Sequence, residues 1–375
     1  MLPLLLSIAF AAVVAAPPAG VVTTVAGTPG AAGYWDGPAP DAMFAHPTWI
    51  EVVGNDIFVI DRINQKIRRI APNGDVSTLA TSRQFPNEPF PIDFGSAFGG
   101  GIVFEPAGCG GGIYGAGMFV AGSGQEQIIL VSMNGQLGSR DAYPVRVGTG
   151  ESGSRDSDMF EAQFRTPVGV AIAARAGHDP FEVLFIADSG NHTIRRADYI
   201  YSPEDCPLPW YVTTLAGVAG QPGSADGARG AARFNTPRGL AALPDGTLFV
   251  TDAGNHTIRK ITPDGTVTTI AGVPGVAGSD DGPALQAHLD TPSGIDVNDK
   301  GELFIADTFN HTIRKLAGGV LTTIAGRPGV SGFADGDAAA AMFNAPVGLK
   351  VAPDGSIVIA DTGNNVIRRF SVHTP

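Results

Sequence analysis

Five aspartate–arginine pairs are the sequence feature that most suggests chemistry. In each pair the arginine follows the aspartate by seven residues. Repeated carboxylates suggest acid–base catalysis, but catalytic groups need different roles at one place, whereas these repeat one role at five places. A buried charge is tolerable when it is paired. We therefore predict structural ion pairs for Asp61 and Arg68, Asp188 and Arg195, Asp252 and Arg259, Asp307 and Arg314, and Asp361 and Arg368.

A degraded copy of the same segment supports this interpretation. Residues 118–136 carry Gly122 and Ile129 at the two positions, so both partners are missing together. A single remaining charge would be costly to bury. Removal of one partner elsewhere should therefore cost about 3–5 kcal/mol.

An Asn-His-Thr tripeptide follows three of the aspartates. Asparagine suits a turn, because its side chain bonds the backbone and it tolerates positive φ. Histidine is a common zinc ligand, but His192, His256 and His311 belong to successive repeats and are expected to lie too far apart to share one ion. We expect turn and surface residues. The turn role already accounts for these asparagines. The tripeptides are also glycosylation sequons, so Asn191, Asn255 and Asn310 are possible glycosylation sites in addition.

Acidic turns form a second repeated set. Ca²⁺ needs several oxygen ligands around one point, whereas Asp-Gly is ordinary turn chemistry, with the aspartate as a cap and the glycine at positive φ. We favour turn capping and keep calcium as an open alternative; no other cofactor is predicted. The set is Asp36, Asp226, Asp281 and Asp335, each before glycine, with Asp156 and Asp158 in one divergent copy.

Function on a repeated scaffold is expected where the copies differ. The first strand of each repeat should face a central channel, where mixed polar residues either bind a small polar ligand or line a water-filled channel. An aromatic, glycine-rich segment in the second repeat is either a partner surface or a loop that covers its own repeat. The channel candidates are Trp49, Glu51, Glu105, Arg238, Asp296 and Lys350, and the surface candidates are Phe85, Phe90, Phe94, Phe98 and Tyr114.

The chain has two cysteines, Cys109 and Cys206. In an oxidising compartment such a pair can form one disulfide, and two thiols are the alternative. A disulfide here would join the two most irregular segments of the chain.

The elements that must position these residues are short strands in a repeat. Asp252, Asp307 and Asp361 are 55 and 54 residues apart, and every copy contains four short β-rich runs between Gly, Pro, Asn and Asp. Units of this kind are propeller blades. Residues 21–27 are a fourth strand with no predecessors, and the last copy ends after its third strand. We predict an all-β, six-bladed β-propeller with four antiparallel strands per blade, in which the N-terminal strand completes the C-terminal blade.

The blocks Asn255-His256-Thr257 and Asn310-His311-Thr312, with their flanking aspartate and arginine, resemble NHL repeats, which are named for Asn-His-Leu. The chain is similar to the NHL propellers of secreted and membrane-anchored proteins, including teneurin ectodomains and bacterial sensor kinases. This resemblance implies partner binding in most cases. A few relatives, such as the amidating lyase of peptide hormones, are enzymes.

The composition and the N-terminal segment limit the kinds of partner and the cellular compartment that we expect. The net charge is −12, with 24 basic and 36 acidic residues, which disfavours nucleic acid as a partner. Residues 1–16 are apolar and end in small residues, which predicts a signal peptide, with a short uncleaved anchor as the alternative. We expect residues 17–375 to form one propeller domain without a transmembrane span. The protein is expected to be a monomer, either secreted or within the secretory pathway.

Three functions fit these observations. The favoured one is an extracellular scaffold that binds a protein or a ligand. The alternative is a propeller enzyme of the lactonase, hydrolase or lyase type with a metal or small-molecule site in the channel. The third is a structural component of a matrix or cell surface.

Overall fold

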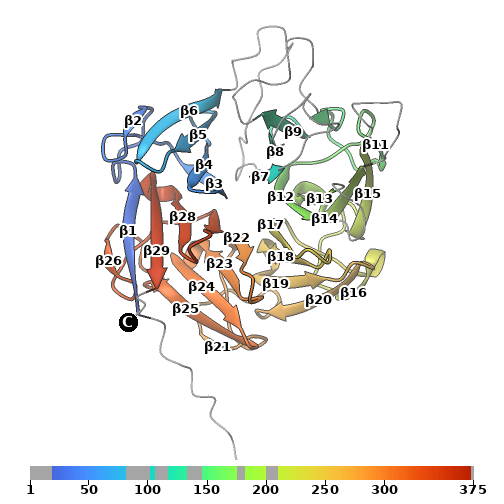
Figure 1. Cartoon of the computed structure of the whole chain (residues 1–375). Helices are drawn as coiled ribbons and strands as arrows, with labels where there is room; N and C mark the ends of the chain where they lie inside the picture. Colours follow the sequence, from blue (N-terminus) through green and yellow to red (C-terminus); the bar gives the residue numbers. More distant parts are fainter. Residues whose placement is uncertain are drawn as a thin grey trace, which may run out of the picture.

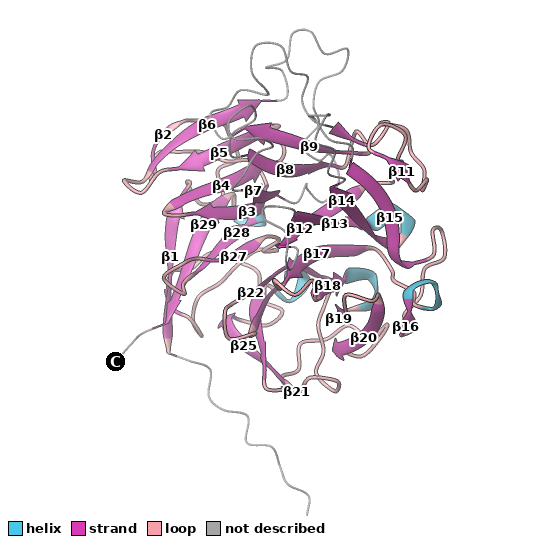
Figure 2. Cartoon of the chain, turned by 45° about the vertical axis from the view of Figure 1, so that its right-hand side comes forward, coloured by secondary structure: helices cyan, strands magenta, loops and turns pink. Residues whose placement is uncertain are grey.

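The fold consists of six antiparallel sheets arranged in a ring, seen in a computed structural model of the chain (Figure 1). The structure describes residues 19–81, 102–105, 117–132, 146–174, 182–199 and 210–372. The predicted all-β, six-bladed propeller is confirmed. The helical segments are single 3-10 turns, among them η1 (Ser189–Asn191) and η3 (Ala253–Asn255), and strands make up the rest of the regular structure (Figure 2).

We number the blades in chain order, and in each blade the first strand lies innermost. Blade one contains β3 (Pro47–Val53), β4 (Asp56–Asp61), β5 (Lys66–Ile70) and β6 (Asp75–Thr81); blade two contains β7 (Ile102–Glu105), β8 (Gly117–Gly122), β9 (Gln127–Ser132) and β10 (Arg146–Val147). Blade three contains β12 (Pro167–Ala174), β13 (Glu182–Asp188), β14 (Thr193–Tyr199) and β15 (Trp210–Gly217); blade four contains β17 (Pro237–Ala242), β18 (Leu248–Asp252), β19 (Thr257–Ile261) and β20 (Thr266–Ala271). Blade five contains β22 (Pro292–Val297), β23 (Leu303–Asp307), β24 (Thr312–Ala317) and β25 (Val320–Gly326); blade six contains β27 (Leu349–Val351), β28 (Ile357–Asp361), β29 (Val366–Val372) and β1 (Gly20–Ala26).

The N-terminal strand closes the ring as predicted. β1 runs antiparallel to β29, with Gly20 opposite Val372 and Val22 opposite Phe370. Val22 is completely buried. The first described strand is thus the fourth strand of blade six, and the pairing covers an edge that would otherwise stay open.

In the part of the chain that the structure describes, five blades carry an additional outer strand of two residues that the sequence did not predict. These strands begin at or next to the acidic turns, and Gly37, for example, pairs with Val76 of β6. Gly37 has φ of 138°, a conformation that favours glycine. The added strands are β2 (Gly37–Pro38), β11 (Ser157–Asp158), β16 (Gly227–Ala228), β21 (Gly282–Pro283) and β26 (Gly336–Asp337).

The core lies between neighbouring blades. Alternate residues of a strand point to opposite faces of a sheet, so Phe58 and Ile60 pack toward blade two while Ile57 and Val59 pack toward blade six. Both faces of each blade are therefore buried, and a blade outside the ring would expose two apolar faces to water.

Glycines bring the innermost strands into close contact near the axis. A Cβ atom at each of these glycines would overlap a backbone carbonyl oxygen of the next blade. For example, Gly294 donates its backbone N–H to the Val347 carbonyl at 2.7 Å. The positions are Gly169, Gly239, Gly294 and Gly348, on blades three to six.

Within the described ranges, no helix is both long and apolar enough to cross a bilayer.

Candidate functional site

The repeated aspartate and arginine side chains form a buried ion cluster within each blade that carries them. In blade four, Arg259 Nη1 lies 2.8 Å from Asp252 Oδ2, and Nη2 lies 2.7 Å from Asp226 Oδ1. Arg259 and Asp252 are completely buried, whereas the Asp226 side chain is 47% exposed. The arginine is therefore held by two carboxylates, and the second comes from the acidic turn.

The same geometry occurs in five blades. The inner pairs at sequence separation seven have N–O distances between 2.6 and 2.9 Å. The acidic turns supply the outer carboxylates, which also accept the backbone N–H of a threonine on the fourth strand, as Asp226 does from Thr269. These outer aspartates were expected to cap their own turns; they link the turn to the arginine and to the fourth strand. They are Asp36, Asp156, Asp226, Asp281 and Asp335, bound to Arg68, Arg195, Arg259, Arg314 and Arg368.

Arg195 of blade three shows how this arrangement differs from the simple pair that the sequence predicts. Its Nη1 lies 2.9 Å from Asp188 Oδ2, the expected partner, but its Nη2 lies 2.7 Å from Asp156 Oδ1, a second partner that the sequence did not indicate. The Nε atom of Arg195 is buried without a hydrogen-bond partner among the described residues, whereas that of Arg68 donates to Asp36. The predicted pair of Asp188 and Arg195 is therefore present, and the structure adds a second carboxylate from the acidic turn.

Burial governs the ionisation of the inner carboxylates. It raises the pKa of Asp252 to about 6, against the lowering effects of a backbone N–H, Arg259 and Asn255. The pKa values of Asp188, Asp307 and Asp361 are raised to about 6 in the same way. All four remain mostly ionised at neutral pH, but they have no contact with solvent. Such groups stabilise the blade and are not placed to meet a substrate.

The asparagines of the tripeptides lie inside the blade turns. Asn255 Nδ2 donates to Asp252 Oδ2 and to the Gly223 carbonyl, both at 2.7 Å, and Asn255 is 7% exposed. Asn191 and Asn310 make the equivalent two bonds. A glycan needs this nitrogen free and accessible. The geometry therefore argues against the predicted glycosylation of the folded chain at all three positions.

The histidines connect consecutive blades, which the sequence did not indicate. His192 Nδ1 accepts the backbone N–H of Thr236 at 3.0 Å, His256 that of Thr291 at 3.1 Å, and His311 that of Ala345 at 3.0 Å. In blade six Asn365 Oδ1 accepts the N–H of His46 at 2.9 Å. Each donor has a positive φ and precedes the first strand of the next blade. We call these contacts the blade latches.

A small chamber lies on the axis among the first strands of blades one, three, four, five and six. Its volume is about 80 Å³. Lys350 Nζ lies 3.3 Å from Glu51 Oε2 and 3.7 Å from Asp296 Oδ1. Glu51 Oε1 also accepts the Val52 N–H, and Asp296 Oδ2 accepts the Val351 N–H at 2.8 Å. We call these three charged side chains the axial triad.

The register explains why the triad lies on one side of the chamber. Glu51, Asp296 and Lys350 occupy equivalent positions on their strands, since each lies opposite the residue three positions before the aspartate that ends the second strand of its blade. Ala171 and Ala241 occupy the same position in blades three and four. The chamber therefore has a charged wall from blades five, six and one, and a small apolar wall opposite.

Electrostatics within the triad are set by burial and by mutual pairing. Burial raises the pKa of Glu51, and the nearby Lys350 ammonium opposes this rise. The two carboxylates raise the pKa of Lys350 although its burial acts in the opposite direction. Lys350 is thus held as an ammonium and is a poor nucleophile. Trp49 also lines the chamber, and its Nε1 is buried without a hydrogen-bond partner among the described residues.

Other candidates lie elsewhere. Arg238 is buried one layer away, where Nη1 donates to Ser293 Oγ at 3.1 Å, and burial lowers its pKa to about 10. Glu105 is the last residue of β7, and the structure does not describe its side chain.

The described residues contain no group of three His, Cys, Asp or Glu side chains that would hold a metal. The predicted aromatic surface and the two cysteines lie outside the described residues: Phe85, Phe90, Phe94, Phe98, Tyr114, Cys109 and Cys206.

Comparison with known proteins assigns the repeat. The family model described as NHL repeat matches residues 234–261, 289–316 and 343–370. Each match ends within two residues of the buried arginine of its blade. The chain is a six-bladed β-propeller that carries NHL repeats in blades four to six. These three copies are the most regular in the sequence.

Two curated relatives are similar over much of the chain. Protein SUPPRESSOR OF QUENCHING 1 of Arabidopsis thaliana is 27% identical over 317 residues, which cover 77% of this chain and 26% of the relative. NHL repeat-containing protein 2 of Gallus gallus is 25% identical over 339 residues, which cover 68% of this chain and 45% of the relative. The chain thus spans less than half the length of either relative.

Solved structures show the same architecture. An auxiliary nutrient binding protein from Bacteroides thetaiotaomicron superposes with a TM-score of 0.64 at 18% identity, over 94% of this chain and 76% of that one. A gluconolactonase from Xanthomonas campestris superposes with a TM-score of 0.51 at 15% identity, over 96% of each chain. At these identities the likeness shows the fold alone.

Proposed function

We propose that the protein is a secreted binding scaffold whose propeller holds a protein or small polar ligand without transforming it. The observation that carries this proposal is the state of its repeated charges. The five buried arginines are each paired within a blade. The axial triad is paired within itself. The described charges at these places therefore serve to hold the ring together.

The size of the axial chamber supports the same proposal. A water molecule takes up about 30 Å³ in the liquid, so a chamber of about 80 Å³ has room for two or three waters. Ligand pockets for organic molecules measure about 300–1,000 Å³. The chamber suits a few ordered waters beside the triad better than it suits a sugar lactone.

The second candidate function is an enzyme that works at the axis. One observation favours it: two carboxylates and one ammonium group from three different blades meet at one place, and burial raises the pKa of Glu51. The Xanthomonas campestris gluconolactonase shares the fold. In the described part of the chain, however, no third His, Cys, Asp or Glu joins Glu51 and Asp296 in a set that would hold a metal.

Two measurements test the proposal on the purified full chain. The first is metal content by mass spectrometry, and the second is hydrolysis of gluconolactone, with Glu51→Gln as the control variant. We expect no stoichiometric metal and no hydrolysis above buffer. Turnover that disappears in Glu51→Gln, or one tightly bound metal per chain, would favour the enzyme.

Secretion is tested separately by expressing the chain in a secretory host. We expect the protein in the medium with an N-terminus close to Pro17, because residues 1–16 have the pattern of a signal peptide. Protein that stays in the cell with Met1 intact would contradict this part of the proposal.

A further inference from the structure

Large exposed apolar side chains gather on one face of three consecutive blades. Among the described residues, eleven large hydrophobic side chains are exposed, and seven of them lie either in the turn after the second strand or in the loop just before the two-residue outer strand of blades five, six and one. Trp35 is 61% exposed and Phe309 is 49% exposed. We call this set the apolar arc: Tyr34, Trp35, Ile63, Val276, Phe309, Val330 and Phe333.

Hydrogen bonds show that the loops and turns of the arc follow one another around the ring. Gly329 N donates to the carbonyl of Asn310, the residue after Phe309, at 3.0 Å. Asn364 then donates from Nδ2 to Gly332, the residue before Phe333, at 2.7 Å. The next loop repeats this pattern, with Gly30 N to Asn364 O at 2.9 Å and Asn64 Nδ2 to Gly33 O at 2.7 Å.

The fold does not require apolar side chains at these positions. Blades three and four have the same loops and turns but carry small or polar residues at the equivalent places. Gly190 and Gly254 stand where blades one and five have Ile63 and Phe309. The other replacements are Ser154 and Ser224 for Tyr34 and Phe333, and Glu151 and Gln221 for Val276 and Val330.

Packing against the ion clusters does not account for the arc either. Tyr34 lies over the Arg68 guanidinium at 5.1 Å, and Phe333 lies over Arg368 at 4.5 Å. In blade four, however, Arg259 is equally buried with Ser224 in the corresponding loop position. The arc therefore exposes apolar surface that blades three and four lack. Exposed apolar patches mark interaction sites.

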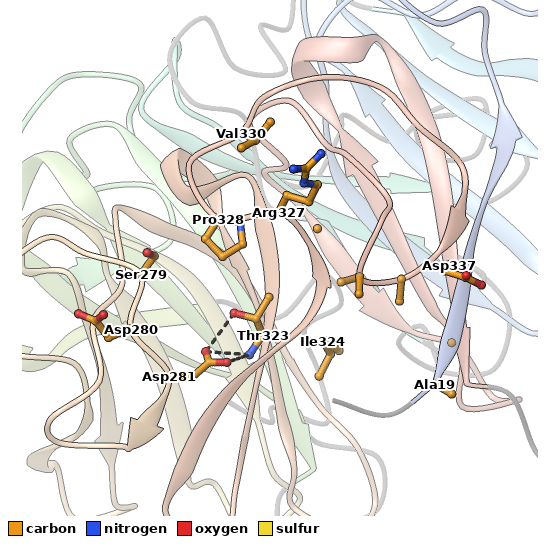
Figure 3. Close-up of a pocket in the computed structure, with 15 residues that line it drawn as sticks. Ala19, Ser279, Asp280, Asp281, Thr323, Ile324, Arg327, Pro328, Val330 and Asp337 are labelled. Carbon is orange, nitrogen blue, oxygen red and sulfur yellow. Dashed lines mark hydrogen bonds between the residues drawn. The ribbon is translucent and has the colours of Figure 1, made fainter. Parts of the chain in front are cut away.

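An acidic groove adjoins the arc between blades five and six (Figure 3). Its volume is about 880 Å³, and Val330 belongs both to its lining and to the arc. Asp280 lies on one side and Asp337 on the other, with Arg327 between the blades. Asp281 also lines the groove, but it is engaged by Arg314 and Thr323. Asp280 Oδ2 lies 3.0 Å from His288 Nδ1, and the Asp280 side chain is 78% exposed to solvent.

Charge identifies the kind of partner. The groove presents two exposed carboxylates against one arginine, and the chain has a net charge of −12. Such a surface repels phosphate backbones and anionic lipids, and a second copy of this acidic chain would also be repelled. A basic segment is attracted, and apolar side chains next to it would cover the arc.

We propose that the apolar arc and the acidic groove bind a segment of a partner protein that carries apolar side chains beside lysine or arginine. This inference rests on the binding function proposed above and names the surface that performs it. The apolar side chains cover Trp35, Phe333 and Phe309, and a basic side chain enters the groove between Asp280 and Asp337. The groove volume of about 880 Å³ admits several side chains of an extended peptide.

Selection from a phage-displayed library of short random peptides on the purified wild-type chain tests the proposal. We expect enriched peptides to combine aromatic or aliphatic residues with lysine or arginine. The arc variant Tyr34→Ser, Phe309→Gly, Val330→Gln imports residues from blades three and four, and it should weaken the binding of a selected peptide at least about tenfold. The matched control is Phe160→Gly with Leu285→Gly, which removes two exposed apolar side chains outside the arc.

The groove is tested by Asp280→Asn with Asp337→Asn. This variant should weaken binding and reduce its dependence on salt, because it removes two of the carboxylates that attract the basic residue. Thermal melting confirms that every variant is folded. Peptides without basic residues, no enrichment at all, or equal losses in arc and control variants would overturn the proposal.

Three further outcomes separate the alternatives. If sedimentation shows a dimer of the wild type and a monomer of the arc variant, the arc binds a second copy of the chain. If the protein binds vesicles of anionic phospholipid and the arc variant does not, the arc binds a membrane. Either outcome overturns the inference and leaves a binding scaffold in place. Lactone turnover at the axis, by contrast, would contradict the proposed function whatever the peptides do.

Discussion

Arg259 Nη1 lies 2.8 Å from Asp252 Oδ2, and neither side chain is reached by solvent. The guanidinium is also 5.2 Å from the centre of the Phe234 ring, so it is enclosed by an aromatic face as well as by carboxylates. The five clusters of this type tie the second and third strands to the outer turn in every blade except blade two. They make charge pairing a condition of blade stability.

Arg259→Met should therefore destabilise the protein strongly. It leaves the Asp252 carboxylate buried beside an apolar side chain, which costs about 3–5 kcal/mol. Chemical denaturation at neutral pH measures the change. The chain supplies a matched control in blade two, which has Gly122 and Ile129 at the two positions.

The double variant Asp252→Gly with Arg259→Ile imports that combination. We expect it to cost less than the sum of the two single changes, because no completely buried charge is left unpaired. Asp226 loses Arg259 but keeps the Thr269 N–H and its contact with solvent. Additive losses would show that the pair is not coupled.

The blade latches predict a pH dependence. The Nδ1 atoms of His192 and His311 accept backbone N–H groups, and burial lowers the pKa of both histidines below the ordinary value. The unfolded chain then binds more protons than the folded chain as pH falls below about 6.5. The histidine contribution to stability is therefore complete above that pH and declines through the folded pKa.

Asn365 provides the control for this prediction, because it forms the blade-six latch without titrating. In the double variant His192→Asn, His311→Asn, the loss of stability between pH 7.5 and 5.5 should be smaller than in wild type. Comparing the two proteins cancels the titration of the shared carboxylates. An identical slope in both would contradict the latch.

Ring closure predicts a difference between two adjacent residues of β1. Val22→Asp places a carboxylate in the core between blades five and six, where Val22 packs near Phe343 and Phe370. We expect a loss of several kcal/mol, on the order of the cost of burying an unpaired charge. Thr23→Asp changes the exposed neighbour and should be nearly neutral. Equal melting temperatures for the two variants would mean that β1 does not close the ring.

The axial triad predicts an unusual order of stabilities. Lys350→Met leaves the buried Glu51 close to Asp296 without their ammonium group, and should cost about 3–5 kcal/mol. The triple variant Lys350→Met, Glu51→Gln, Asp296→Asn removes all three charges and keeps carbonyl oxygens for the Val52 and Val351 N–H groups. It should be more stable than the single variant in urea denaturation; the reverse order would argue that the triad is not a paired unit.

Much of the fold could be predicted from the sequence because the sequence repeats the pattern of a blade several times. The spacing of Asp252, Asp307 and Asp361 revealed the blade, and the unpartnered strand at residues 21–27 revealed the closure. Pairing at a separation of seven was visible because one copy lacks both partners together. The two-residue outer strands were missed, since a Gly-Pro segment has no strand-like pattern of its own.

The sites were harder to predict because they depend on contacts between distant segments. The second partner of Arg195, Asp156, lies 39 residues away, and the His256 latch to Thr291 spans 35 residues, so local turn chemistry explained each aspartate and histidine by itself. The channel candidates were chosen by proximity to the first strands. In the structure, the strand register places Arg238 at a different level along the channel from the axial triad. This register depends on bulges in the first strands, which have no recognisable pattern in the sequence.

The glycines at the axis have a consequence for how this molecule can evolve. Because Gly169, Gly239, Gly294 and Gly348 let each first strand touch the next, a side chain at any one of them must push a whole neighbouring blade outward. The diameter of the central channel is therefore set by the blades together, and a change in one blade cannot alter it independently. New specificity is easier to acquire on the rim, where each loop varies without disturbing the others.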